Sequence, residues 1–236
     1  FTLYEQNKVT LEFSYIHKTG IFQSNQEGKF AMDTVLMVDG DFVYALVHVM
    51  DSPFRVEFNP RRLVSVSGQI TGSQFKAPLE VKEIAFMDDP RIIIVPLYAN
   101  PQELIKSTGI KLFQAPQNPF LFDDAVVVDV KDSRFGQTNC LRDPKDGRYI
   151  KVDKKHFAFL TGAFNPGKGD LVFSQKAELL GIMVNEDFAF HVKNLGNRIE
   201  GDSRTLLGNS FEAEKTNKML QELKKKLSGL SKKFKY

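Results

Sequence analysis

The sequence predicts an all-β fold that ends in an α-helix. Short apolar or alternating segments recur along most of the chain, and Gly, Pro and Asp-Gly turns separate them. Such a series of strands is typical of a β-sandwich or a β-barrel. Residues 209–236 differ, because their leucines recur at steps of three and four, which is the period of a helix.

Composition limits the classes to which the protein can belong. The chain has 236 residues, 42% of them hydrophobic, which is enough for one all-β domain or two small ones. A net charge of +3 is too small to indicate nucleic-acid binding, and the single Cys excludes an intrachain disulfide. No apolar run approaches 18 residues, so we expect no transmembrane segment.

The first half is predicted to consist of strands. Residues 1–25 contain two of them by alternation. Residues 31–38 and 42–49 are both apolar, and Asp39-Gly40-Asp41 between them predicts a hairpin with a tight turn. Further strands are expected at 55–58, 63–70, 80–86 and 92–97.

A Pro-, Gly- and Gln-containing stretch, 99–118, is interpreted as a linker with a helical turn at 102–106. Residues 135–148 are polar and predict a loop. Strands are expected at 124–130, 149–152, 156–160 and 188–192, with a hairpin at 171–173 and 179–183.

The stretch Phe164–Met183 carries a family resemblance. Asn165-Pro166-Gly167 opens it, and Glu178-Leu179-Leu180-Gly181-Ile182 closes it. It resembles the active-site hairpin of trypsin-like serine proteases, closest to the high-temperature-requirement type. The Ser-Gly-Gly-Pro centre of that motif is replaced by Lys168-Gly169-Asp170-Leu171, one residue shorter overall. The nucleophile is therefore missing.

Two more segments are similar to parts of that family. Residues 38–51 resemble the strand that carries the catalytic His, which places His48 as a general base. Residues 87–95 resemble the strand that begins with the orienting acid, with Asp89 as the better match and Asp88 as the alternative. The alternative interpretation is purely structural. His48 would then end a strand without a catalytic role, and Asp88 and Asp89 would only start a strand after a turn.

The resemblance implies two six-stranded antiparallel β-barrels with a C-terminal α-helix. The expected parts are an N-terminal barrel (1–100), a linker (101–118), a C-terminal barrel (119–208) and a basic amphipathic helix (209–236). It implies a secreted or periplasmic location and no cofactor. The four His show no metal-ligand spacing, and Cys140 does not occupy the nucleophile position.

The expected function is that of a catalytically inactive homologue that binds a protein or an extended peptide in the groove between the barrels. Lys168, Gly169 and Asp170 are the expected binding positions, and Lys168 is expected either to pair with Asp89 or to point into solvent. One alternative is an active serine-type endopeptidase with a displaced nucleophile such as Ser174. Another is a structural protein whose barrels present the helix for assembly.

The C-terminal helix leaves three interpretations open. Its apolar positions lie among eight Lys between Lys215 and Lys235. The helix is expected to pack on its own domain, where the trypsin-like fold places it on the second barrel, or to self-associate, or to attach to an acidic surface. Its start is expected at Asn209-Ser210, with Glu212 completing a cap. The apolar positions are Leu220, Leu223, Leu227, Leu230 and Phe234.

Overall fold

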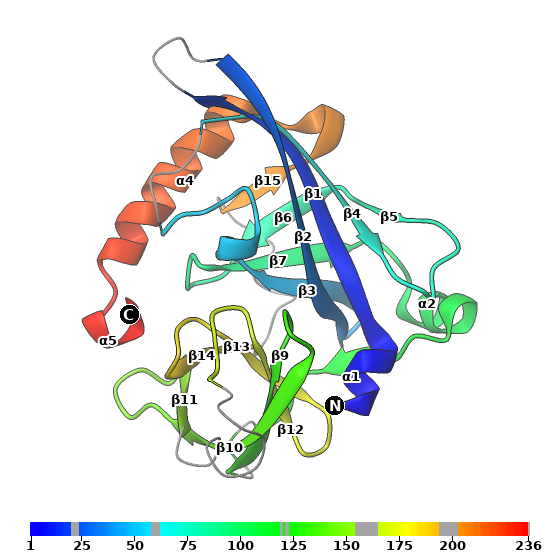
Figure 1. Ribbon diagram of the computed structural model, residues 1–236, viewed down its shortest axis with the longest axis vertical. Coiled ribbons are helices and arrows are strands. Elements are labelled where there is room, and N and C mark those ends of the chain that lie inside the picture. Colours follow the sequence, from blue (N-terminus) through cyan, green and yellow to red (C-terminus); the bar gives the residue numbers. More distant parts are fainter. Residues whose placement is uncertain are drawn as a thin grey trace.

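An open β-sheet and a closed β-barrel make up most of the computed structural model, which describes residues 1–19, 24–57, 62–118, 120, 123–153, 165–193 and 203–235 (Figure 1). The nine-stranded sheet has the order β15-β6-β7-β3-β2-β1-β4-β5, and β8 pairs parallel to β2. Its strands are β1 (Lys8–Thr19), β2 (Ser24–Asp39), β3 (Phe42–His48), β4 (Arg62–Thr71), β5 (Leu79–Val81), β6 (Glu83–Phe86), β7 (Ile92–Leu97), β8 (Phe113–Gln114) and β15 (Arg204–Leu206).

The barrel is antiparallel and closes in the order β10-β11-β14-β13-β12-β9. Its strands are β9 (Asp124–Asp129), β10 (Arg134–Arg142), β11 (Tyr149–Asp153), β12 (Leu171–Ser174), β13 (Leu179–Met183) and β14 (Phe188–His191). The described helices are α1 (Thr2–Asn7), α2 (Pro101–Thr108), α4 (Ala213–Ser228) and α5 (Lys232–Lys235), with short 3-10 turns at Val49–Asp51 and Gly208–Ser210.

The predicted all-β class with a C-terminal helix is confirmed. The hairpin at 31–49 forms as expected, since Asp39 pairs with Phe42 and Gly40 has a φ of +59° at the turn. One detail differs: the first sheet is not hydrogen-bonded into a closed six-stranded barrel. In addition, β15 lies in the segment expected to form the second barrel, yet it pairs with β6 of the first sheet.

Several predicted elements are wrong. Residues 2–7 form α1 instead of a strand, because Tyr4 packs into the core from a helix and the Asn7 side chain bonds to Leu3 O. Residues 55–57 form a turn whose Val56 packs into the core, which produces strand-like alternation without a strand. The segment 135–148, predicted as a polar loop, contains most of β10.

Two other predicted strands have a different outcome. The segment 80–86 forms two strands where one was expected, and the strand expected at 156–160 lies outside the described residues.

Strand β10 was not predicted because its sequence does not alternate between apolar buried and polar exposed residues. Gly136, Thr138 and Cys140 are buried, whereas Phe135, Gln137 and Leu141 are exposed. The buried face thus has small or polar residues, and the exposed face has two large apolar ones. The strand therefore looks like a loop when it is judged by hydropathy alone.

The core lies in three clusters, and one of them joins the two β-units. The first fills the sheet, and another fills the barrel. The joining cluster combines Met37, Tyr44 and Ile94 of the sheet with barrel residues such as Phe173 and Phe190. The sheet and the barrel are thus packed together through apolar side chains.

Helix α4 packs on the sheet and not on the second barrel, which corrects that expectation. Leu220 and Leu223 belong to the sheet's core cluster. Asn217 fixes the helix on β4, since its side chain donates to Leu63 O at 2.8 Å and accepts from Leu63 N at 2.9 Å. The expected capping arrangement is absent, because Glu212 is the N-cap and makes no side-chain capping hydrogen bond. Figure 1 shows α4 along one side of the sheet, leading to α5 beside the barrel.

We predict that Leu223→Asp destabilises the chain by about 3 kcal/mol or more, because it places a carboxylate in the sheet core. The measurement is the free energy of unfolding in urea. Leu141→Asp is the matched control, since Leu141 is 49% exposed and should tolerate the same change with a loss below about 1 kcal/mol. Equal losses in the two variants would contradict the packing of α4 described above.

Candidate functional site

His48 ends β3 at the junction between the sheet and the barrel, and its side chain is buried, with 1% of the residue exposed. Its Nδ1 accepts a hydrogen bond from the Met50 backbone N–H at 3.1 Å. A nitrogen that accepts has no proton, so the neutral ring carries its proton on Nε2. Among the described residues, Nε2 has no hydrogen-bond partner.

The surroundings of His48 favour its neutral form. Burial lowers its pKa well below the usual range, and the positive charges of Arg91, Lys168 and Lys131 lower it further. The ring is therefore uncharged at neutral pH. The expectation that Lys168 would disfavour protonation of His48 agrees with this direction, although burial is the larger cause.

Asp89 is fully buried, and its carboxylate is saturated by other partners. It accepts from the Arg91 backbone N–H at 3.0 Å, from Arg91 Nε at 3.0 Å and from Arg91 Nη2 at 2.7 Å. It also accepts from the Tyr149 hydroxyl at 2.8 Å. In the described part of the chain, no hydrogen bond joins Asp89 to His48.

The turn formed by residues 167–170 lies against His48. Gly169 has a φ of +93°, and a Cβ at that position would lie 3.4 Å from His48 Cβ and 3.2 Å from Asp51 Oδ2. A left-handed backbone in such close contact favours glycine. The glycine at position 169 therefore allows the turn to approach His48, which lies 121 positions earlier in the chain.

Three backbone N–H groups of this turn, those of Gly167, Gly169 and Asp170, donate to acceptors within the protein. Gly167 N donates to Asp170 Oδ2 at 2.6 Å, and Gly169 N donates to Met183 O at 2.9 Å. Asp170 N donates to Gly167 O at 3.2 Å. Asp170 itself is buried, and burial raises the pKa of its carboxyl to about 7. Its oxygen thus fixes the turn from inside.

Lys168 pairs with Glu57 and not with Asp89, which corrects the predicted ion pair. Lys168 Nζ lies 3.1 Å from Glu57 Oε1. Arg91 occupies the position at Asp89 that was expected for Lys168, because an Arg two residues away presents its planar guanidinium to both carboxylate oxygens. Lys168 remains 39% exposed, so it also reaches solvent.

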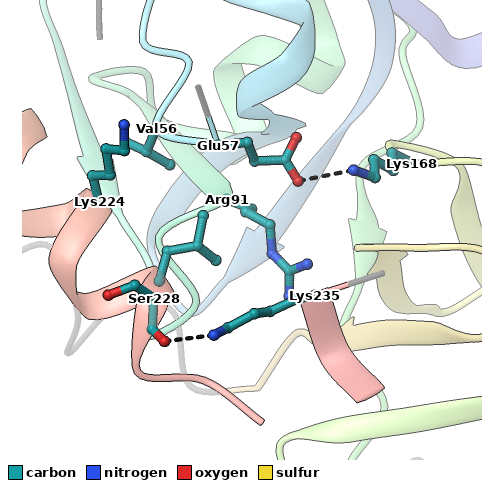
Figure 2. A pocket seen from close by; sticks show the side chains of 8 residues that line it. Val56, Glu57, Arg91, Lys168, Lys224, Ser228 and Lys235 are labelled. Atoms are coloured by element: carbon teal, nitrogen blue, oxygen red, sulfur yellow. Dashed lines mark hydrogen bonds and ion pairs between the residues drawn. The ribbon is translucent and has the colours of Figure 1, made fainter. Parts of the chain in front are cut away.

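A pocket of about 370 Å³ lies beside this ion pair (Figure 2). The sheet, the barrel turn and both C-terminal helices contribute to its wall. Four cationic side chains and one carboxylate line it, which gives a formal charge of +3, and Val56 and Leu227 provide apolar surface. The lining residues are Val56, Glu57, Arg91, Lys168, Lys224, Leu227, Ser228 and Lys235.

Of these lining residues, only Lys168 is among the predicted site residues. Arg91 lies two positions after Asp89 and just before the predicted strand at 92–97. Glu57 was placed on a strand, and Lys224 and Lys235 were counted only as part of a basic helix face. The available signal was the Asp-Asp-Pro-Arg run at 88–91, since an acid and an Arg two positions apart at a strand start can pair.

Other reactive side chains are not positioned for chemistry. Cys140 is buried, and burial raises the pKa of its thiol to about 12. The Ser174 hydroxyl donates to Glu178 Oε2 at 2.9 Å and accepts from the N–H groups of Lys176 and Glu178 at 3.2 Å each. Within the described residues no group of three or more His, Cys, Asp or Glu side chains is arranged to hold a metal ion. None of the helices described combines the length and apolar character needed to cross a membrane.

No protein-family model matches the sequence, and no curated protein matches it either. Among solved structures, the tobacco etch virus protease with bound product is similar at 9% identity and a TM-score of 0.39, over 85% of this chain and 80% of that chain. The thermostable serine protease AL20 from an extremophilic microorganism matches at 8% identity and a TM-score of 0.42, over 80% and 92%. The inactivated protease paralogue S-D1 of the scabies mite matches at 11% identity and 0.38, over 93% and 92%. At these values the comparisons assign the chain neither a family nor an activity.

Proposed function

We propose that this chain is a protease-like protein without peptidase activity that binds a protein segment or an extended peptide at the junction between the sheet and the barrel. One observation carries the proposal. The Nδ1 atom of His48, which a catalytic triad uses to meet its carboxylate, accepts the Met50 N–H instead. The ring therefore has the wrong tautomer for a general base acting through Nε2.

Two further groups needed for catalysis are occupied. A triad carboxylate orients the imidazole, but the Asp89 oxygens are bound by Arg91 and Tyr149. An oxyanion hole needs backbone N–H groups that point at the substrate. At the corresponding turn, the N–H groups of Gly167 and Gly169 are bound to Asp170 and Met183.

The alternative is an active serine-type endopeptidase that uses Ser174. Ser174 is the last residue of β12 (Leu171–Ser174), whereas Gly169, the residue of the turn beside His48, precedes that strand. The Ser174 hydroxyl also serves the 174–178 turn. The structure thus offers more support to the binding function.

The pocket supports binding by its chemistry. Its cations favour a negatively charged group, and Val56 and Leu227 offer a surface for apolar side chains. Of the predicted binding positions, Lys168 lines the pocket, whereas Gly169 and Asp170 shape the turn that holds it. Self-association through α4 is a weaker proposal, because Leu220 and Leu223 are already buried in the same chain.

We predict no peptidase activity. Casein should not be cleaved above the buffer background, and a fluorophosphonate probe should not label the protein. Ser174→Ala provides the control, since it should leave both readouts unchanged. Casein turnover that disappears in Ser174→Ala would promote the displaced-nucleophile alternative.

We predict that His48 stays neutral down to a pH well below 6.5, because burial and three nearby cations oppose its protonation. Lys168→Met removes one of those cations and should raise the His48 pKa, whereas Lys106→Met on the exposed face of α2 should not. An NMR titration of the ring measures both. In the unfolded chain the His titrates near 6.5, so its protonation there makes the folded state lose stability as the pH falls below that value. A His48 pKa of 6.5 or higher would contradict the described burial.

We predict that a pentaglutamate peptide binds the protein and that pentalysine does not. The positive lining attracts carboxylates, so the affinity should fall as salt is raised. Lys168→Ala combined with Lys224→Ala should weaken binding about tenfold, measured by anisotropy of a neutral dye on the peptide. Lys106→Ala combined with Lys145→Ala is the matched control for net charge. Equal binding by both double variants would remove the pocket from the proposal.

A further inference from the structure

The last helix, α5, is a separate element and not the end of α4. Helix α4 ends at Ser228, Gly229 caps it, and α5 begins at Lys232. A helix of four residues has no stability of its own, because nucleation costs more than so few hydrogen bonds return. The conformation of α5 therefore depends on the surface on which it docks.

An aromatic side chain anchors α5. Phe234 is 3% exposed, and its ring stacks on Tyr149 with centroids 3.8 Å apart and an angle of 13° between the rings. The edge of the Phe188 ring packs against it at 5.0 Å and 81°. Both receptor rings belong to the barrel, so the barrel provides a fitted pocket for one aromatic residue.

Two hydrogen bonds hold the backbone of Lys233 and Phe234, and one ion pair holds the Lys233 side chain. Arg91 Nη1 donates to Phe234 O at 2.5 Å, and Asn185 Nδ2 donates to Lys233 O at 3.1 Å. Lys233 Nζ lies 2.6 Å from Asp143 Oδ2, and Asp143 is only 5% exposed. The surface thus recognises two consecutive carbonyl groups, a Lys side chain and the aromatic residue after it.

These contacts are of the kind that proteins use to bind peptides in trans: a buried aromatic anchor, main-chain hydrogen bonds and one specific charge pair. The groups that contact Lys233 and Phe234 lie on the segment 89–91, on the barrel between 143 and 149, and at 184–188, whereas Lys235 Nζ donates to Ser228 O at the end of α4. The receptor is therefore complete without the covalent link to the tail. We call the surface formed by Arg91, Asp143, Tyr149, Asn185 and Phe188 the tail site.

We propose that the tail site is a peptide-binding site for a partner segment in which Lys precedes an aromatic residue, and that the chain occupies this site with its own residues 232–235. Charge complementarity to Asp143 requires the Lys, and the Tyr149 and Phe188 rings require the aromatic residue. If the site were vacated, Arg91 would lose a buried acceptor, which favours a new occupant over an empty surface.

The attached tail competes with any partner. A short linker holds it at an effective concentration on the order of millimolar, so a free peptide can bind measurably only when the tail is weakened. The inference goes beyond the proposed function, because its ligand is cationic and aromatic and its site, apart from Arg91, is formed by barrel-side residues that do not line the cationic pocket. The two are neighbours, since Lys235 lines that pocket.

The test uses the full-length chain with Phe234→Ala, which removes the anchor of the tail and leaves the receptor intact. The probe is the peptide Ser-Lys-Lys-Phe-Lys-Tyr, which copies residues 231–236, acetylated and labelled with a neutral dye. Fluorescence anisotropy should show binding to the variant at least about tenfold tighter than to the parent chain. A second probe in which Ala replaces the Phe should bind the variant at least about tenfold more weakly than the first.

A second variant keeps the proposal testable if Phe234→Ala does not fold. Lys233→Glu places a carboxylate beside Asp143 and loosens the tail without creating a cavity, so it should also bind the probe. Equal binding of the two probes, or no binding to a folded variant, would overturn the proposal. A dimer of the parent chain that Phe234→Ala abolishes would assign the site to the tail of a second copy and would also overturn it.

Discussion

The buried ion pair between Asp89 and Arg91 is the interaction on which the junction depends. Both side chains are fully buried, and their closest atoms, Arg91 Nη2 and Asp89 Oδ2, lie 2.7 Å apart. Both residues lie between β6 and β7 of the sheet. Asp89 accepts a hydrogen bond from the Tyr149 hydroxyl of the barrel, and Arg91 donates to Val184 O and to Phe234 O of α5. Three parts of the chain therefore meet at one charge pair. Loss of either partner leaves an uncompensated buried charge, which typically costs about 3–5 kcal/mol.

The same pair determines what His48 can do. The Asp89 carboxylate accepts its hydrogen bonds from Arg91 and Tyr149 and none from the imidazole of His48. The Nδ1 atom of His48 instead accepts from the Met50 N–H. The guanidinium adds a positive charge near a buried ring, which opposes its protonation. The Arg91 side chain thus neutralises the buried Asp89 and at the same time opposes protonation of His48. This is the physical basis of the proposed non-catalytic function.

The sequence was informative where structure depends on neighbouring residues. Gly40 between two acids specifies a hairpin locally, and the leucine spacing specifies α4. It was uninformative where structure depends on distant partners. The three residues of β15 carry no pattern and become a strand only by pairing with β6. Likewise, the predicted strands at 55–58 and 92–97 do not indicate that Glu57 pairs with Lys168 or that Arg91 donates to Val184 O on the barrel side of the junction.

The C-terminal segment connects these observations, because it crosses the junction from one β-unit to the other. Asn217 attaches α4 to β4 of the sheet, while Phe234 attaches α5 to the barrel. Only residues 229–231 join the two helices, and a stretch of three residues spans about 10 Å at most. Leu227, Ser228 and Lys235 of this segment form one wall of the cationic pocket, and Arg91 contributes to both the pocket and the tail site. Of these wall residues, Leu227 and Ser228 stay with α4 on the sheet, and Lys235 belongs to the tail. An exchange of the tail for another peptide would therefore remove one of the four cations that line the pocket.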